Sequence, residues 1–149
     1  MRTAEHRLDA RGAHLFVMHA LIQGEERMNP EDMKKRTMEY ALRVVRLVGS
    51  LPKDPVSRHI GGQLLRAGTS VPANYRAACR ARSKAEFVSR MGIVEEEADE
   101  ALFWMEFLIA AGIMPSGRMG DLMNEGNEIV SIVVRSRQTA RARAASKAR

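Results

Sequence analysis

Cysteine is almost absent from this chain of 149 residues, and no stretch of the chain is both long and apolar. The single cysteine, Cys79, cannot form an intramolecular disulfide and leaves no cluster of thiolates for zinc. No apolar run reaches the roughly 20 residues that span a bilayer, and no secretory signal pattern is visible. The sequence therefore predicts a cytoplasmic protein that does not enter a membrane.

Aromatic residues make up 5% of the chain, although hydrophobic residues of all kinds make up 45%. Such a composition is typical of helices packed through Leu, Val, Met and Ala. The ten methionines need no cofactor to explain them, because their flexible thioethers fill irregular gaps in a helical core.

The residues that could carry catalysis are not arranged for it. Glu96, Glu97 and Glu100 lack the histidine that carboxylate-bridged metal sites place three residues after a glutamate. His59 precedes Cys79 by about five and a half helical turns, so the two side chains cannot form a nucleophile–base pair on one helix. We therefore expect no enzyme activity, no metal and no cofactor.

Acidic residues are missing from residues 135–149, which hold six of the 24 basic residues. The other 134 residues carry 18 basic and 18 acidic groups, so the net charge of +6 lies entirely in this C-terminal segment. Within the body, residues 34–90 are strongly basic and residues 95–128 are mostly acidic. Two regions of opposite sign can meet within a bundle or between subunits.

Hydrophobic periodicity predicts four helices, at about 30–48, 56–79, 83–110 and 122–134. Turns that contain Pro or Gly separate them. The stripes expected to face the core on the second and third helices are Ile60, Leu64, Ala67, Val71, Tyr75 and Ala78, and Phe87, Met91, Val94, Ala98, Ala101, Met105 and Ile109. This pattern predicts an all-α, antiparallel up-down four-helix bundle over residues 29–137.

The two ends of the chain differ from this bundle. Asn29 and Pro30 are typical of a helix start, whereas residues 1–28 do not continue the pattern. We expect residues 1–28 to be a loose or disordered N-terminal extension, or else translation to start at Met28, so that residues 1–27 are not part of the protein. Residues 138–149 contain alanines but no apolar face, which predicts a basic tail that is frayed or disordered.

Polar residues form a second stripe beside each apolar one. If the second and third helices are antiparallel, Arg66 can reach Glu97 or Glu100, and the remaining hydrogen-bond needs can be met by Gln63, Ser70 and Asn74. A guanidinium with two carboxylates inside a bundle must be fully hydrogen-bonded to be tolerated. The first interpretation is a buried structural network that fixes helix register, and the second is a ligand site.

A set of residues recurs along the second and third helices at a distinctive spacing: Gln63, Arg66, Ala67, Ser70, Asn74, Ser83, Phe87, Glu97, Glu100 and Trp104. This set resembles the signature of the bacterial four-helix bundle protein family, also described as products of intervening sequences in large-subunit ribosomal RNA genes. The resemblance covers roughly Met33 to Arg135. Ala77 stands where the family usually has a glutamate, so a role for that carboxylate does not carry over.

The resemblance implies a homopentameric ring with no established enzymatic activity. The chain is also similar to the accessory variability proteins of diversity-generating retroelements, basic rings linked to nucleic acid and to a reverse transcriptase. These similarities imply RNA or DNA, a reverse transcriptase or another protein, and further copies of this chain as partners.

Two surfaces follow from this reasoning. Contacts to nucleic-acid backbone are expected from Lys34, Lys35, Arg36, Arg58, Arg76, Arg80, Arg82, Lys84, Arg135, Arg137, Arg141 and Arg143. Subunit contacts are expected from an apolar face of the third helix that is wider than an intramolecular core needs, namely from Phe103, Trp104 and Phe107. The alternative function is a protein-binding scaffold without direct nucleic-acid contact.

Overall fold

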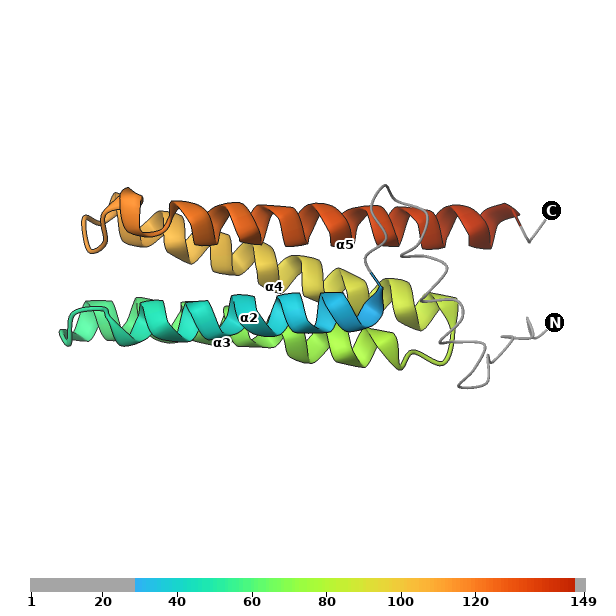
Figure 1. Cartoon of the computed structure of the whole chain (residues 1–149), viewed down its shortest axis with the longest axis horizontal. Coiled ribbons are helices and arrows are strands. Elements are labelled where there is room, and N and C mark those ends of the chain that lie inside the picture. The colour runs from blue at the N-terminus through green and yellow to red at the C-terminus, as the bar shows by residue number, and fades with distance from the viewer. Residues whose placement is uncertain (1–28, 147–149) are drawn as a thin grey trace.

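The computed structural model describes residues 29–146, and these residues form an up-down bundle of four long helices. The helices are α2 (Pro30–Gly49), α3 (Pro55–Cys79), α4 (Lys84–Ala110) and α5 (Gly120–Ser146), with a short 3-10 turn η1 (Ser116–Arg118) before α5. Figure 1 shows that consecutive helices run in opposite directions. The predicted all-α, antiparallel four-helix bundle is confirmed, and the expected extension 1–28 lies outside the described residues.

Side-chain caps begin the first two helices. The Asn29 side chain accepts a hydrogen bond from the backbone N–H of Asp32 at 2.9 Å, and Pro30 follows as the first helical residue. Asp54 caps α3 in the same way, accepting from the N–H groups of Val56 and Ser57, each at 3.0 Å. A hydrogen bond from the Ser57 hydroxyl at 2.6 Å, together with these backbone bonds, holds the pKa of the Asp54 carboxyl below its ordinary value.

Both ends of α4 are set by local chemistry. Ser83 accepts from the N–H of Glu86 at 3.1 Å, and the Glu86 carboxylate accepts from the N–H of Arg82 at 2.8 Å. This is close to a capping box, with the returning bond made one residue earlier than in the standard motif. The helix ends before Gly112, whose φ of +69° is a left-handed conformation that favours glycine.

The core is a single cluster that runs the length of the bundle. The α3 stripe expected from the sequence is buried throughout, and so is the α4 stripe from Phe87 to Met105. Helices that follow one another in the chain pack side by side: α2 on α3, α3 on α4 and α4 on α5. The contact between α2 and α5, which closes the bundle, is the least extensive of the four. The α3–α4 pair is therefore the centre of the fold.

Two glycines of α3 let α2 come close. At Gly68, an added Cβ would lie only 2.7 Å from Cγ1 of Val44, and at Gly61 it would lie 3.3 Å from Cγ1 of Val48. A Cβ at Gly62, by contrast, would meet no atom within 4 Å. The α2–α3 distance thus depends on the absence of a side chain at Gly68.

The C-terminal end of the bundle differs from the sequence prediction. The bundle was expected to end at residue 137, but α5 continues to Ser146, and Ala140 is fully buried. The buried stripe passes from Ile129 through Val133 to Ser136 and Ala140, and its last two members are small. Their size explains why no apolar face is visible in the sequence, and alanine's high helix propensity supports the additional turns.

The glycine contacts give a prediction about stability. Gly68→Ala should lower the free energy of unfolding by about 1–2 kcal/mol, because overpacking against Val44 outweighs the gain in helix propensity. Gly62→Ala is the matched control and should raise it by up to about 1 kcal/mol. Urea denaturation of both variants measures the difference, and equal stabilisation by the two alanines would contradict the close α2–α3 packing.

Candidate nucleic-acid interface

Four helix termini meet at one end of the bundle, because α2 begins, α3 ends, α4 begins and α5 ends there (Figure 1). Most of the cations expected to contact nucleic acid lie on these segments. We call this set the basic end: Lys34, Lys35, Arg76, Arg80, Arg82, Lys84, Arg135, Arg137, Arg141 and Arg143. Arg58, in the first turn of α3, lies at the opposite end of the bundle.

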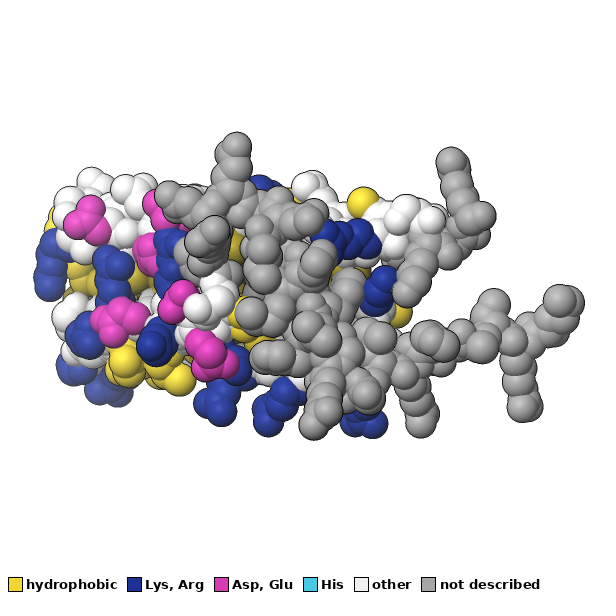
Figure 2. All heavy atoms as spheres, turned by 45° about the vertical axis from the view of Figure 1, so that its right-hand side comes forward, with side chains coloured by type: hydrophobic (Ala, Val, Ile, Leu, Met, Phe, Trp, Pro, Cys, Tyr) yellow, Lys and Arg dark blue, Asp and Glu magenta, His cyan; other side chains and the backbone are white. Residues whose placement is uncertain are grey.

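Most side chains of the basic end reach solvent. Lys35, Arg76, Arg80, Arg82 and Arg141 are all exposed. Figure 2 shows Lys and Arg side chains over both halves of the visible face, with the Asp and Glu side chains among them in the left half. The basic end thus presents exposed cations to solvent, and further exposed cations, such as Lys53 and Arg58, lie at the opposite end of the bundle.

Arg36 joins α2 to α5 instead of projecting into solvent. Its guanidinium binds Glu125 through two hydrogen bonds, from Nε at 2.5 Å and from Nη2 at 2.9 Å, and it also binds Glu128. The hydrogen bond to Glu125 raises the pKa of Arg36 above its ordinary value. Arg36, which the sequence predicted to contact phosphate, is therefore paired within the protein. It joins α2 to α5, the two neighbouring helices with the least extensive packing.

Arg137 is also engaged within the bundle. It donates a hydrogen bond to Glu95 of α4, and its side chain is only 21% exposed. A Cβ on Gly92 would lie 3.1 Å from Nη2 of Arg137, so the glycine gives the guanidinium room to lie flat on α4. Arg137 therefore supports the α4–α5 contact, and the sequence prediction did not identify its acidic partner.

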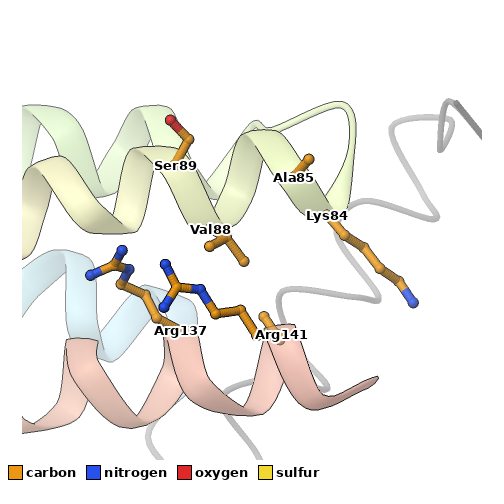
Figure 3. A pocket seen from close by; sticks show the side chains of 7 residues that line it. Lys84, Ala85, Val88, Ser89, Arg137 and Arg141 are labelled. Atoms are coloured by element: carbon orange, nitrogen blue, oxygen red, sulfur yellow. The ribbon is translucent and has the colours of Figure 1, made fainter. Parts of the chain in front are cut away.

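A groove of about 450 Å³ lies between the first turns of α4 and the last turns of α5 (Figure 3). Its apolar lining includes Ala85, Val88 and Ala140, and Ser89 lies at its edge with the hydroxyl group pointing away from α5. Arg137 and Arg141 reach across toward α4, while the end of Lys84 points away. Cations around an apolar lining are suited to an anionic group with a nonpolar part, such as a sugar-phosphate unit.

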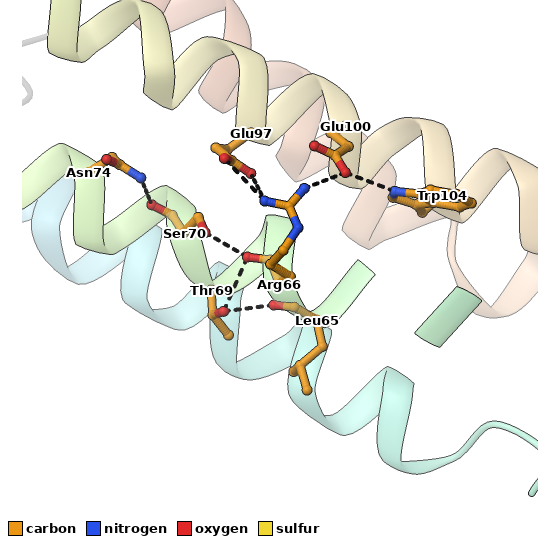
Figure 4. Close-up of polar contacts among 8 residues, drawn as sticks. All are labelled: Leu65, Arg66, Thr69, Ser70, Asn74, Glu97, Glu100 and Trp104. Carbon is orange, nitrogen blue, oxygen red and sulfur yellow. Dashed lines mark hydrogen bonds and ion pairs between the residues drawn. The ribbon is translucent and has the colours of Figure 1, made fainter. Parts of the chain in front are cut away.

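The polar network of α3 and α4 forms, but at the surface (Figure 4). Arg66 binds Glu97 at 3.3 Å and Glu100 at 2.5 Å, as expected from antiparallel helices. The Arg66 side chain is, however, 51% exposed, so the expectation of a buried network was wrong. Hydrogen bonds from Arg66 and from Nε1 of Trp104 hold the pKa of Glu100 below its ordinary value.

The other members of the predicted network do not join this ion pair. Ser70 donates to the carbonyl oxygen of Arg66 at 2.7 Å, and Asn74 donates to that of Ser70 at 2.9 Å, both within α3. Gln63 is partly buried, and it makes no side-chain hydrogen bond with another of the residues 29–146. Serine and asparagine side chains readily form hydrogen bonds to backbone carbonyl groups of the preceding helical turn. The ion pair therefore consists only of Arg66, Glu97 and Glu100.

An aromatic cluster follows the ion pair along α4. Phe103 and Phe107 are exposed, at 51% and 43%, and Trp104 is partly buried. The Phe103 and Trp104 rings meet edge-on with centroids 4.9 Å apart, and the centroids of Trp104 and Phe107 are 5.9 Å apart. The structure therefore places the predicted subunit contacts together on an open face.

Cys79 and the clustered carboxylates are the other groups that could carry chemistry in the sequence. Burial raises the pKa of the Cys79 thiol, which keeps it protonated and a poor nucleophile. No group of three or more His, Cys, Asp or Glu in this range could hold a metal ion. None of the helices described is long and apolar enough to cross a bilayer.

The two arginine bridges predict different effects on stability. Arg36→Ala should lower the free energy of unfolding by about 1–2 kcal/mol, because it leaves the half-buried Glu125 carboxylate unpaired. Arg66→Ala should cost clearly less, because solvent screens its exposed pairs. Urea denaturation compares the two variants, and an Arg66→Ala loss as large as that of Arg36→Ala would contradict this ranking.

Comparisons with known proteins agree with this architecture. A sequence model described as 23S rRNA-intervening sequence protein matches residues 31–135. A search among curated proteins found no significant match. The fold is similar to the crystal structure of a protein of unknown function from the S23 ribosomal protein family of Bacteroides thetaiotaomicron, with a TM-score of 0.65 and 31% sequence identity.

That similarity covers 68% of this chain and 94% of the Bacteroides protein, so it includes nearly the whole of the neighbour. The family match extends from the first turn of α2 to Arg135 in α5 and thus takes in the complete helical bundle except the last turns of α5. The chain belongs to the 23S rRNA-intervening sequence protein family.

Proposed function

We propose that this protein is a non-enzymatic, homo-oligomeric helical-bundle module of the cytoplasm that binds the phosphate backbone of RNA or DNA. The observation that carries the proposal is the basic end, where exposed cations from α2, α3, α5 and the α3–α4 turn lie together. Such cations neutralise phosphates and release counterions without reading base sequence.

The composition of the basic end favours backbone contacts over base contacts. Its arginines and lysines are not interleaved with exposed aromatic residues, which stacking on single-stranded bases requires. The continuation of α5 to Ser146 also matters, because it gives Arg135, Arg141 and Arg143 a helical support instead of a loose tail. Ordered cations lose less conformational entropy on binding than cations on a disordered segment.

Self-association is the second part of the proposal. The open aromatic cluster of Phe103, Trp104 and Phe107 supports it, and the family resemblance adds a pentameric ring as the expected assembly. Several basic ends in one particle would contact the same polyanion together. Individually weak phosphate contacts then add through their high effective concentration.

The names of the relatives point in the same direction. The family description refers to sequences that intervene in 23S ribosomal RNA, and the Bacteroides protein is assigned to a ribosomal protein family, although its own function is unknown. Both names associate such proteins with RNA. They support RNA over DNA as the first polyanion to test.

A second function, a protein-binding scaffold, is favoured by the same aromatic cluster. Phe103 and Phe107 could contact another protein, such as the reverse transcriptase implied by the family resemblance. Apolar contacts of this kind depend little on salt, whereas phosphate contacts weaken steeply as salt rises. The salt dependence of binding therefore separates the two functions.

The basic end gives a direct binding prediction. The triple variant Arg76→Ala, Arg80→Ala, Arg141→Ala should bind a labelled RNA duplex about tenfold or more weakly at low salt. The slope of log K against log salt should become shallower by up to about 0.9 for each phosphate that the variant no longer neutralises. Fluorescence anisotropy across a salt series measures both quantities.

A control variant carries the same charge change at the other end of the bundle. Lys53→Ala, Arg58→Ala, Arg118→Ala removes three exposed cations near the α2–α3 turn and η1. This control should retain the affinity and the salt slope of the parent protein. Equal losses in the two triple variants would show that net charge alone matters, and the basic end would not be the site.

A further inference from the structure

Two exposed apolar stripes lie on different helices of the bundle. On α2, Met38, Leu42 and Val45 are 43–44% exposed, and on α4, Phe103 and Phe107 are 51% and 43% exposed. Each set follows helical spacing, so its members form one continuous strip. Contiguous apolar surface of this kind usually marks an interaction site on a folded protein.

Within residues 29–146, no helix covers either stripe. α2 and α4 occupy opposite corners of the bundle, because each packs against α3 and α5 and they make no substantial contact with each other. The outward faces of the two helices therefore point in different directions. A second copy of the chain can therefore supply a surface to each stripe.

The charges around the two stripes are complementary. The exposed cations Lys35 and Arg46 flank the α2 stripe, at positions 11 residues or about 16 Å apart along the helix. The α4 stripe is flanked by Glu96, Asp99 and Glu106, of which the outer two are 10 residues or about 15 Å apart. The cations of one stripe and the carboxylates of the other thus have nearly the same spacing.

These charges are available for a partner within the part of the chain described. Lys35, Glu96, Asp99 and Glu106 make no ion pair with another of the residues 29–146, and Arg46 makes only an exposed one with Glu39 at 3.3 Å. An exposed pair of that kind contributes little and is easily exchanged. Pairing α2 with α4 would match opposite charges, whereas pairing α4 with α4 would bring six carboxylates together.

We propose that the α2 stripe of one copy packs against the α4 stripe of the next copy. This proposal rests on the self-association included in the proposed function and names the two surfaces that make it. Such a contact is heterologous, since it joins two different faces, and it repeats from copy to copy into a ring or an open chain. The hydrogen bond from Trp104 to Glu100, at 3.1 Å, holds the aromatic cluster in place for it.

The test uses one variant on each stripe. Leu42→Glu and Phe103→Glu should each reduce the mass measured by light scattering to that of a single chain, with helicity retained because both residues are exposed. An equimolar mixture of the two should give a species of two chains, because the first variant keeps its α4 stripe and the second keeps its α2 stripe. Val56→Glu is the control: Val56 is 60% exposed on α3, outside both stripes, and this variant should keep the mass of the parent.

The other outcomes contradict the proposal in distinguishable ways. If Phe103→Glu dissociates but Leu42→Glu keeps the parent mass, or if the mixture remains single chains, the α2–α4 contact is wrong while self-association through α4 stands. If the parent protein is itself a single chain at all concentrations, the self-association in the proposed function fails as well. Should circular dichroism show that either glutamate variant has lost helicity, Met38→Ser and Phe107→Ser provide the same comparison.

Discussion

The packing of α3 against α4 is the interaction on which the rest of the structure depends. Both helices bury an unbroken stripe, and the two stripes face each other along the bundle. α2 attaches to the outside of α3 where Gly68 leaves room for Val44, and α5 attaches to α4 where Gly92 leaves room for Arg137. The two outer helices are held to each other much less, and the Arg36 bridge to Glu125 strengthens that side.

The position of the positive charge follows from this topology. Residues that are far apart in the sequence, such as Lys35, Arg80 and Arg141, come to the same end because each helix reverses the direction of the last. The cations divide into two groups by their partners. Arg36 and Arg137 are half-buried and bound to carboxylates, so they stabilise helix contacts, whereas most of the basic end faces solvent and is left for an external anion.

The sequence was sufficient to predict the parts of the fold that depend on local chemistry. The caps at Asn29 and Ser83 and the buried stripes of α3 and α4 follow from residue type and helical period alone. On α2, Tyr40, Val44 and Leu47 are buried, whereas Val45 is 44% exposed. Apolar residues cover much of that helix, so periodicity could not decide which of its valines faces inward.

Features that depend on distances between helices were less predictable. Pairing of Arg66 with Glu97 and Glu100 was foreseen from an antiparallel arrangement, but its exposure was not, because pattern alone cannot give the depth of a polar stripe. The partners of Arg36 and Arg137 lie on other helices and have no local signal. The end of α5 was missed because Ser136 and Ala140 continue the buried stripe with side chains too small to register as apolar.

Assembly and phosphate binding are physically coupled in the proposed function. α2 and α4 run in the same direction along the bundle, so a parallel contact between them places the basic ends of neighbouring copies on the same side. Bringing these ends together costs electrostatic repulsion, which a bound polyanion removes. By linkage, nucleic acid then strengthens the subunit contact by the same free energy with which assembly strengthens nucleic-acid binding. An antiparallel contact would separate the basic ends and remove this coupling, so the relative direction of two exposed helices determines whether assembly helps the protein to hold a polyanion.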